Sequence, residues 1–196
     1  MARPKAFDRD TALQRAIALF RDKGYAGAST EDLLGAMGIG RQSMYDTFGD
    51  KRGLYLAALE RYNTDSVAEF VRDLDADGSP LRALDAALQG FARRAASGCT
   101  GCMGVGAVLE FGQSDPDVAA LTGASSRSQL AALERQLRSA VAAGELAADL
   151  DVQAAAGFIA SSMAGMRVAA RAGAGVPALE QMARFTTLAL RPAAGA

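Results

Sequence analysis

The sequence of 196 residues contains no histidine and no tryptophan. The absence of histidine excludes the Ser-His-Asp and Cys-His catalytic arrangements, the HExxH metalloprotease site and the Cys2His2 zinc finger. Only two cysteines are present, Cys99 and Cys102, and a single closely spaced pair does not make the disulfide framework of a secreted protein. We therefore expect a protein outside the common hydrolase classes, with no metal and no cofactor, in a reducing compartment.

Long hydrophobic runs are also missing. The longest stretches without a charged residue are residues 95–109 and 152–166, and both are shorter than the roughly 18–20 apolar residues that span a bilayer. The amino-terminal residues contain no apolar segment of the kind that directs export. These absences predict a cytoplasmic protein with no membrane span.

The residues that are present favour helices. The five prolines are far apart, and the intervals between them are rich in alanine, leucine, arginine and glutamate. Leu13, Ile17 and Phe20 recur at the spacing of one apolar helix face. We find no strand-like alternation and expect an all-α fold. The expected helices cover about residues 8–23, 29–38, 41–47, 51–74, 79–97, 102–112, 123–144, 150–173 and 176–190.

Two of these helices are short and are joined by a tight turn within residues 29–55. Ser29 and Asp32 have the spacing of a capping box, and Gly38 ends the first short helix. This is the pattern of a helix-turn-helix, whose second helix enters the major groove of DNA. An exposed polar hairpin without nucleic-acid contact is the alternative that the spacing alone leaves open. The side chains placed to contact base edges or phosphates are Arg41, Gln42, Ser43, Tyr45 and Lys51.

A longer motif runs without insertion from residue 16 to residue 54. Its residues are Ala18, Leu19, Phe20, Lys23, Gly24, Tyr25, Ser29, Asp32, Leu33, Gly38, Ile39, Tyr45, Phe48, Lys51 and Leu54. This motif resembles the amino-terminal motif of the TetR family of transcriptional regulators. Beyond it, the chain is similar to that family only in length and in its helical layout.

The resemblance implies an architecture and a function. A helix-turn-helix DNA-binding domain over residues 1–50 is expected to precede a larger helical ligand-binding and dimerisation domain over residues 51–196. The family's regulators are homodimers, usually repressors, that bind a palindromic double-stranded operator and respond to a small molecule. Its DNA-contacting positions fall on Ser29, Arg41, Gln42, Ser43, Tyr45, Thr47 and Lys51.

Two residues depart from the family's pattern. Gly40 stands where the family often has a capping serine or threonine, which removes a hydroxyl that could bind phosphate. Asp46 places a carboxylate in the recognition helix, where it could accept a hydrogen bond from a cytosine amine or repel a phosphate. The bases that this helix reads do not follow from the resemblance.

Cys99 and Cys102 form a Cys-x-x-Cys pair. Such a pair can be a redox couple or half of a four-ligand metal site, but the chain has no third cysteine and no histidine to complete the latter. The plainest interpretation is that both cysteines pack as small apolar side chains. The alternative is a sensor thiol at Cys102, because a helix begins there and its dipole favours the reactive thiolate; in a few TetR-like regulators that resemble this chain, such a thiol senses oxidants or electrophiles.

The expected carboxyl-terminal domain, residues 51–196, supplies a candidate pocket and a candidate interface. Large apolar side chains there indicate either plain core or a wall around an apolar effector. Gly157, Ser161 and Gly165 recur every four residues and leave a helix surface that another helix can approach closely, as a homodimer would require. The candidate pocket residues are Phe91, Phe111, Phe158, Met163 and Met166.

Two rival functions come from other classes. A thiol-based helical redox enzyme using Cys99 and Cys102 would explain the cysteines but not residues 29–55. A helical interaction scaffold without DNA affinity would explain the helices alone. We therefore predict a DNA-binding regulator and not an enzyme.

Overall fold

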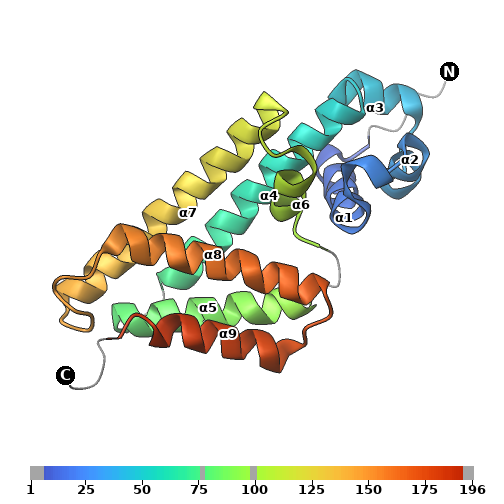
Figure 1. The fold of residues 1–196 in the computed structure, drawn as a ribbon. Coiled ribbons are helices and arrows are strands. Elements are labelled where there is room, and N and C mark those ends of the chain that lie inside the picture. Colours follow the sequence, from blue (N-terminus) through green and yellow to red (C-terminus); the bar gives the residue numbers. More distant parts are fainter. Residues whose placement is uncertain (1–6, 76–77, 98–100, 192–196) are drawn as a thin grey trace. The chain divides into compact units, whose positions relative to one another are not determined.

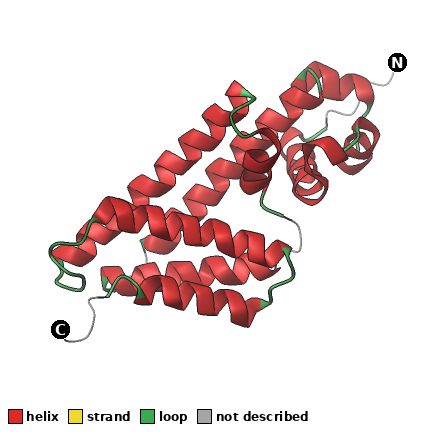
Figure 2. Ribbon diagram, in the orientation of Figure 1, coloured by secondary structure: helices red, strands yellow, loops and turns green. Residues whose placement is uncertain are grey.

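The computed structural model describes residues 7–75, 78–97 and 101–191. These described residues form helices joined by loops and contain no strand (Figure 2). None of the helices in these ranges is long and apolar enough to cross a membrane. The helices are α1 (Arg9–Gly27), α2 (Thr30–Met37), α3 (Arg41–Phe48), α4 (Lys51–Leu74), α5 (Pro80–Ser97), α6 (Met103–Phe111), α7 (Pro116–Ala142), α8 (Val152–Arg171) and α9 (Val176–Leu188), labelled in Figure 1.

The expected all-α fold is confirmed, and two helix bounds differ from those expected. Helix α1 continues past Gly24, its expected end, through a kink at that residue and stops at Gly27. Helix α7 begins at Pro116 rather than at 123. Its start is capped by Asp115 Oδ1, which accepts hydrogen bonds from the backbone N–H groups of Asp117 and Val118 at 3.0 and 3.2 Å.

The chain divides into two compact units. The first unit contains residues 1–64 and 102–122, and the second contains 65–101 and 123–196. The first unit therefore extends beyond residue 50, the expected end of the DNA-binding domain, and includes α6. The functional division at residue 50 stays a prediction.

The core of the first unit gathers buried side chains from α1 to α4, α6 and the start of α7. Leu33, Met44 and Leu54 are fully buried in it, and Ile17 and Phe48 belong to the same cluster. Met44 and Phe48 lie one helical turn apart on α3 and so anchor that helix to α1 and α2. Full burial of one such side chain contributes about 1.5–3 kcal/mol.

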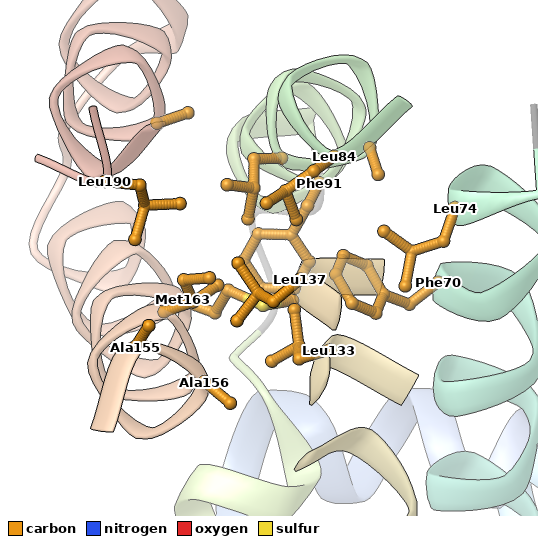
Figure 3. Packing of buried hydrophobic residues seen from close by; sticks show 14 of the residues in the cluster. Phe70, Leu74, Leu84, Phe91, Leu133, Leu137, Ala155, Ala156, Met163 and Leu190 are labelled. Atoms are coloured by element: carbon orange, nitrogen blue, oxygen red, sulfur yellow. The ribbon is translucent and has the colours of Figure 1, made fainter. Parts of the chain in front are cut away.

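The core of the second unit is aliphatic with one phenylalanine from each of two helices. Phe70 and Phe91 pack with Leu133 and Leu137 of α7 and with Met163 of α8 (Figure 3). Every one of these side chains is at least nine-tenths buried.

Candidate nucleic-acid interface

Hydrogen bonds fix both ends of α2, the second of which leads into the turn to α3. Ser29 caps α2 through a capping box, in which Asp32 N donates to Ser29 Oγ at 3.1 Å and Ser29 N donates to Asp32 Oδ2 at 3.3 Å. Gly38 ends α2 in the left-handed conformation with φ of 69°, and its N–H donates to Leu34 O at 3.0 Å. A residue with a Cβ would be strained at this φ. The helix-turn-helix expected from the sequence is therefore present in the fold.

Helix α3 presents a polar outer face. Its buried side is occupied by Met44 and Phe48, so the residues between them point away from the core. Among the predicted contact residues, Ser29, Arg41, Gln42 and Tyr45 are exposed, and Ser43, Thr47 and Lys51 are half-buried. Five of the seven lie on α3, while Ser29 is the N-cap of α2 and Lys51 is the first residue of α4.

The side chains of this face are held by neighbours that the sequence did not reveal. Arg41 is ion-paired with Glu31 of α2. Gln42 Nε2 donates to Asp46 Oδ1 at 2.7 Å, one turn further along α3. The hydrogen bond to Asp46 uses one of the two hydrogens of the Gln42 amide nitrogen, so this amide keeps one donor and its acceptor oxygen.

The amino end of α2 carries a second charged pair. Lys23 Nζ of α1 lies 2.9 Å from Asp32 Oδ2. The hydrogen bond from Lys23, followed by those from Ser29, lowers the pKa of the Asp32 carboxyl below its ordinary value. The capping carboxylate of Asp32 is therefore ionised in neutral solution, and its negative charge is stabilised by the positive end of the α2 helix dipole.

The turn from α3 to α4 requires a second glycine that sequence reasoning missed. Asp50 Oδ1 accepts a hydrogen bond from Gly53 N at 2.7 Å. A Cβ built on Gly53 would overlap the backbone oxygen of Phe48, so no larger residue fits without moving the end of α3. Lys51, at the start of α4, has its Nζ 4.5 Å from the centroid of the Tyr25 ring of α1, a cation–π arrangement.

A carboxylate from α6 occupies the kink in α1. Gly24 has φ of 72° and ψ of −179°. Glu110 accepts hydrogen bonds from Tyr25 N at 3.0 and 3.1 Å and from Ala26 N at 3.2 Å. The kink frees these N–H groups from the helix, and Glu110 supplies the partner that they would otherwise lack.

A second link joins α4 to the start of α7. Arg52 Nη2 lies 2.9 Å from Asp115 Oδ1 and 2.8 Å from Asp117 Oδ2. The backbone hydrogen bond from Val118 is the largest cause that lowers the pKa of the Asp115 carboxyl, and Arg52 adds to it. The two aspartates in turn raise the pKa of the Arg52 guanidinium.

Of the two candidate sensor cysteines, Cys99 lies outside the described residues. Cys102 is half-buried and is the N-cap of α6. Its Sγ accepts hydrogen bonds from Val105 N at 3.4 Å and from the Tyr62 hydroxyl at 3.5 Å. In the described ranges no cluster of three or more potential ligands could hold a metal ion.

The five candidate pocket residues are divided between the two units. Phe91, Met163 and Met166 are buried in the core of the second unit, where the Arg167 guanidinium lies 4.7 Å from the centroid of the Phe91 ring. Phe111 belongs instead to the first unit, with its ring centroid 5.3 Å from that of Tyr25. Phe158 is 48% exposed. A pocket lined by these residues stays a prediction.

The last two helices share an exposed apolar surface in the second unit. Phe158 and Val168 of α8 are exposed, as are Met182, Phe185 and Leu188 of α9, with Phe185 at 63%. A Cβ on Gly157 would meet no atom within 4 Å, and one on Gly165 would meet only Met182 Cε, at 3.9 Å. We refer to these seven residues as the α8–α9 surface. Exposed apolar patches of this kind mark interaction sites.

Comparisons with known proteins cover both units. A family model described as "Bacterial regulatory proteins, tetR family" matches residues 12–58, and one described as "Tetracyclin repressor-like, C-terminal domain" matches residues 80–186.

Relatives and solved structures agree with these matches. The HTH-type transcriptional repressor ComR of Escherichia coli is 32% identical over 97% of this chain and 91% of its own length, and the uncharacterised HTH-type regulator YezE of Bacillus subtilis is 36% identical over 81% and 84%. The structure of a cysteine-substituted CifR, a TetR family regulator complexed with 26-bp double-strand operator DNA, is similar with a TM-score of 0.86 and 32% identity. That likeness covers 96% of this chain and all of the CifR chain.

Proposed function

The chain belongs to the tetR family of bacterial regulatory proteins, and we propose that it is a homodimeric repressor that binds a palindromic DNA operator and leaves it on receiving a chemical signal. The family regulates transcription, so the chain is a DNA-binding regulator and not the thiol-based enzyme considered above. Repression, dimerisation and release are the proposed part.

The observation that carries the proposal is the exposed outer face of α3. Arg41, Gln42 and Tyr45 project from it, while Met44 and Phe48 hold the opposite side in the core. Polar side chains at the start of a recognition helix are the ones that reach base edges. The complex of the CifR variant with operator DNA and the repressor ComR support the same role for this chain.

Dimerisation is supported by the α8–α9 surface. Two copies related by a two-fold axis would cover the exposed Phe158, Phe185 and Leu188 of each with those of the other. A two-fold dimer also presents two recognition helices to the two halves of a palindrome. Sedimentation should show a dimer at micromolar concentration. Phe185→Glu should shift it to monomer, whereas Arg138→Glu, at an exposed residue of α7 that is not part of this surface, should not.

The signal is proposed to be an apolar small molecule or a thiol-reactive compound. The aliphatic core around Phe91, Met163 and Met166 favours an apolar effector. Cys99 and Cys102 are the candidate residues that a thiol-reactive compound would modify. Since the operator lies in the bacterial chromosome, we place the protein in the cytoplasm.

Selection of bound fragments from random DNA tests the repressor function. We expect one palindromic sequence, and Arg41→Ala should lose about 1–3 kcal/mol of affinity per half-site for it while binding to random DNA changes little. Arg138→Ala, which removes an exposed arginine of α7, is the matched control and should bind as the parent does. No enriched sequence, or an equal loss on all DNA for Arg41→Ala, would contradict direct base reading by α3.

A further inference from the structure

The outermost direction of the recognition helix α3 is occupied by an acidic side chain. Met44 and Phe48 are buried in the core, so they define the inner side of this helix. At about 100° per residue, Asp46 points roughly 180° away from the midpoint between these two side chains. Asp46 is exposed. A carboxylate therefore lies at the centre of the face that the proposed function turns toward DNA.

Asp46 is bonded to a neutral group and not to a cation. Its Oδ1 accepts a hydrogen bond from Gln42 Nε2 at 2.7 Å, one turn earlier on α3. The other carboxylate beside this face belongs to Glu31 of α2 and is paired with the guanidinium of Arg41, so its charge is balanced within the protein. The amide of Gln42 does not balance the charge of Asp46. When α3 approaches DNA, the Asp46 carboxylate must meet a hydrogen-bond donor or weaken the complex.

The major groove offers few donors to a carboxylate. Guanine presents the acceptors O6 and N7 there, and thymine presents the acceptor O4. Cytosine presents its N4 amine, whereas adenine presents its N6 amine beside the acceptor N7. An ionised carboxylate only accepts hydrogen bonds, so guanine, thymine and the phosphates repel it. Cytosine is the base whose groove edge carries a donor without an acceptor of its own.

We propose that Asp46 is a specificity-determining residue that selects cytosine at one position of each operator half-site. This inference rests on the proposed function, because it names a base that the recognition helix reads. The second oxygen of Asp46, Oδ2, accepts from the N4 amine of cytosine while Oδ1 stays bonded to Gln42. Repulsion of guanine and thymine adds to the selection, because specificity is a difference between affinities.

The same hydrogen bond makes Asp46 a positioning residue for Gln42. A carboxylate oxygen repels an amide oxygen, so the Gln42 amide turns its nitrogen toward Asp46. The remaining N–H and the Oε1 of Gln42 form a donor and acceptor pair that matches N7 and N6 of adenine. Gln42 and Asp46 together therefore read one adenine and one cytosine within a half-site.

The test is selection of bound fragments from random double-stranded DNA by the full-length parent and three variants. Asp46→Asn keeps the shape of the side chain and an oxygen that accepts from Gln42, but its amide nitrogen donates. Asp46→Ala removes the partner of Gln42 as well, and alanine is a better helix former than aspartate. Asp149→Asn is the control with the same change of charge, at an exposed residue of the loop between α7 and α8.

We expect the parent to enrich a palindrome with a cytosine at one position of each half-site. Replacing this cytosine by thymine should weaken binding of the parent about tenfold per half-site, measured by fluorescence anisotropy on the selected operator. Asp46→Asn should distinguish the two bases less than about threefold, because its amide donates to thymine O4, and it should keep the preference for adenine. Asp46→Ala should relax both positions, and Asp149→Asn should select the same sequence as the parent.

A carboxylate that only repels phosphate gives a different result. Both Asp46 variants would then bind all DNA more tightly with unchanged base preferences, which would overturn the proposal. An unchanged preference for adenine in Asp46→Ala would overturn the positioning of Gln42. A selected palindrome without a cytosine preference that Asp46→Asn relaxes contradicts the reading by Asp46 alone, whereas no selected sequence for the parent contradicts the proposed repressor as well.

Discussion

Replacing Gly24 by alanine should destabilise the first unit through two separate effects. The residue has φ of 72° and ψ of −179°, a conformation that is nearly restricted to glycine and costs a residue with a Cβ about 1–3 kcal/mol. The added Cβ would also overlap Glu110 Oε1 and push away the carboxylate that Tyr25 N and Ala26 N donate to. Because water reaches this site, the lost hydrogen bonds add only about 1 kcal/mol.

The expected total of about 2–4 kcal/mol can be divided by a double-mutant cycle. In a Glu110→Ala background the overlap is gone, so Gly24→Ala should cost only its backbone strain, and the difference between the two backgrounds should be about 1 kcal/mol. Urea unfolding followed by circular dichroism measures each free energy of unfolding.

Gly27→Ala is the matched control for this substitution. Gly27 ends the same helix, has no positive φ, and a Cβ there would lie 3.5 Å from Lys23 Cβ, an ordinary contact. Its replacement should change stability little or raise it by about 0.4–1 kcal/mol. If Gly24→Ala proves as harmless as Gly27→Ala, the kink is not a fixed feature of α1 and the role given to Glu110 is wrong.

Three further outcomes are expected. Gly53→Ala should cost more than about 2 kcal/mol and abolish operator binding in a gel shift, while Gly35→Ala, which adds a Cβ in open space, should do neither. Lys51→Ala should weaken all DNA alike and reduce the salt dependence of binding by about one unit per subunit. Asp115→Asn should lower stability near neutral pH. Because its folded pKa lies below the ordinary 3.8, its stabilisation is present above that pH, and the difference from the parent should vanish as acid titration passes through the lower value.

The sequence predicted the helix-turn-helix well because its signals are local. The Ser29 capping box and the Gly38 stop each depend on residues within one helical turn, and the structure shows both. The burial of Met44 and Phe48 follows from their spacing of one turn along a single helix. Such features need no knowledge of the rest of the fold.

The features that sequence reasoning missed depend on residues far apart in the chain. Glu110 is separated from Tyr25 by 85 positions, and Arg52 from Asp115 by 63; no spacing rule connects either pair. Nothing in the composition distinguishes Phe158 from the buried phenylalanines. Its exposure depends on which side of α8 faces the core, and only the structure shows this. The start of α7 was missed because Gly123 and three serines near it weaken the helical pattern.

Helix α6 connects Cys102 with the kink of α1. Cys102 is the N-cap of this helix, and Glu110 lies in its last turn, roughly 12 Å away at the rise of an α-helix. Glu110 accepts hydrogen bonds from the backbone of Tyr25 and Ala26, the segment that leads into the Ser29 cap of α2. Because Leu33 of α2 and Met44 of α3 lie in the same core cluster, we expect a displacement of α6 to change the position of α2 and, through the core contacts, of α3.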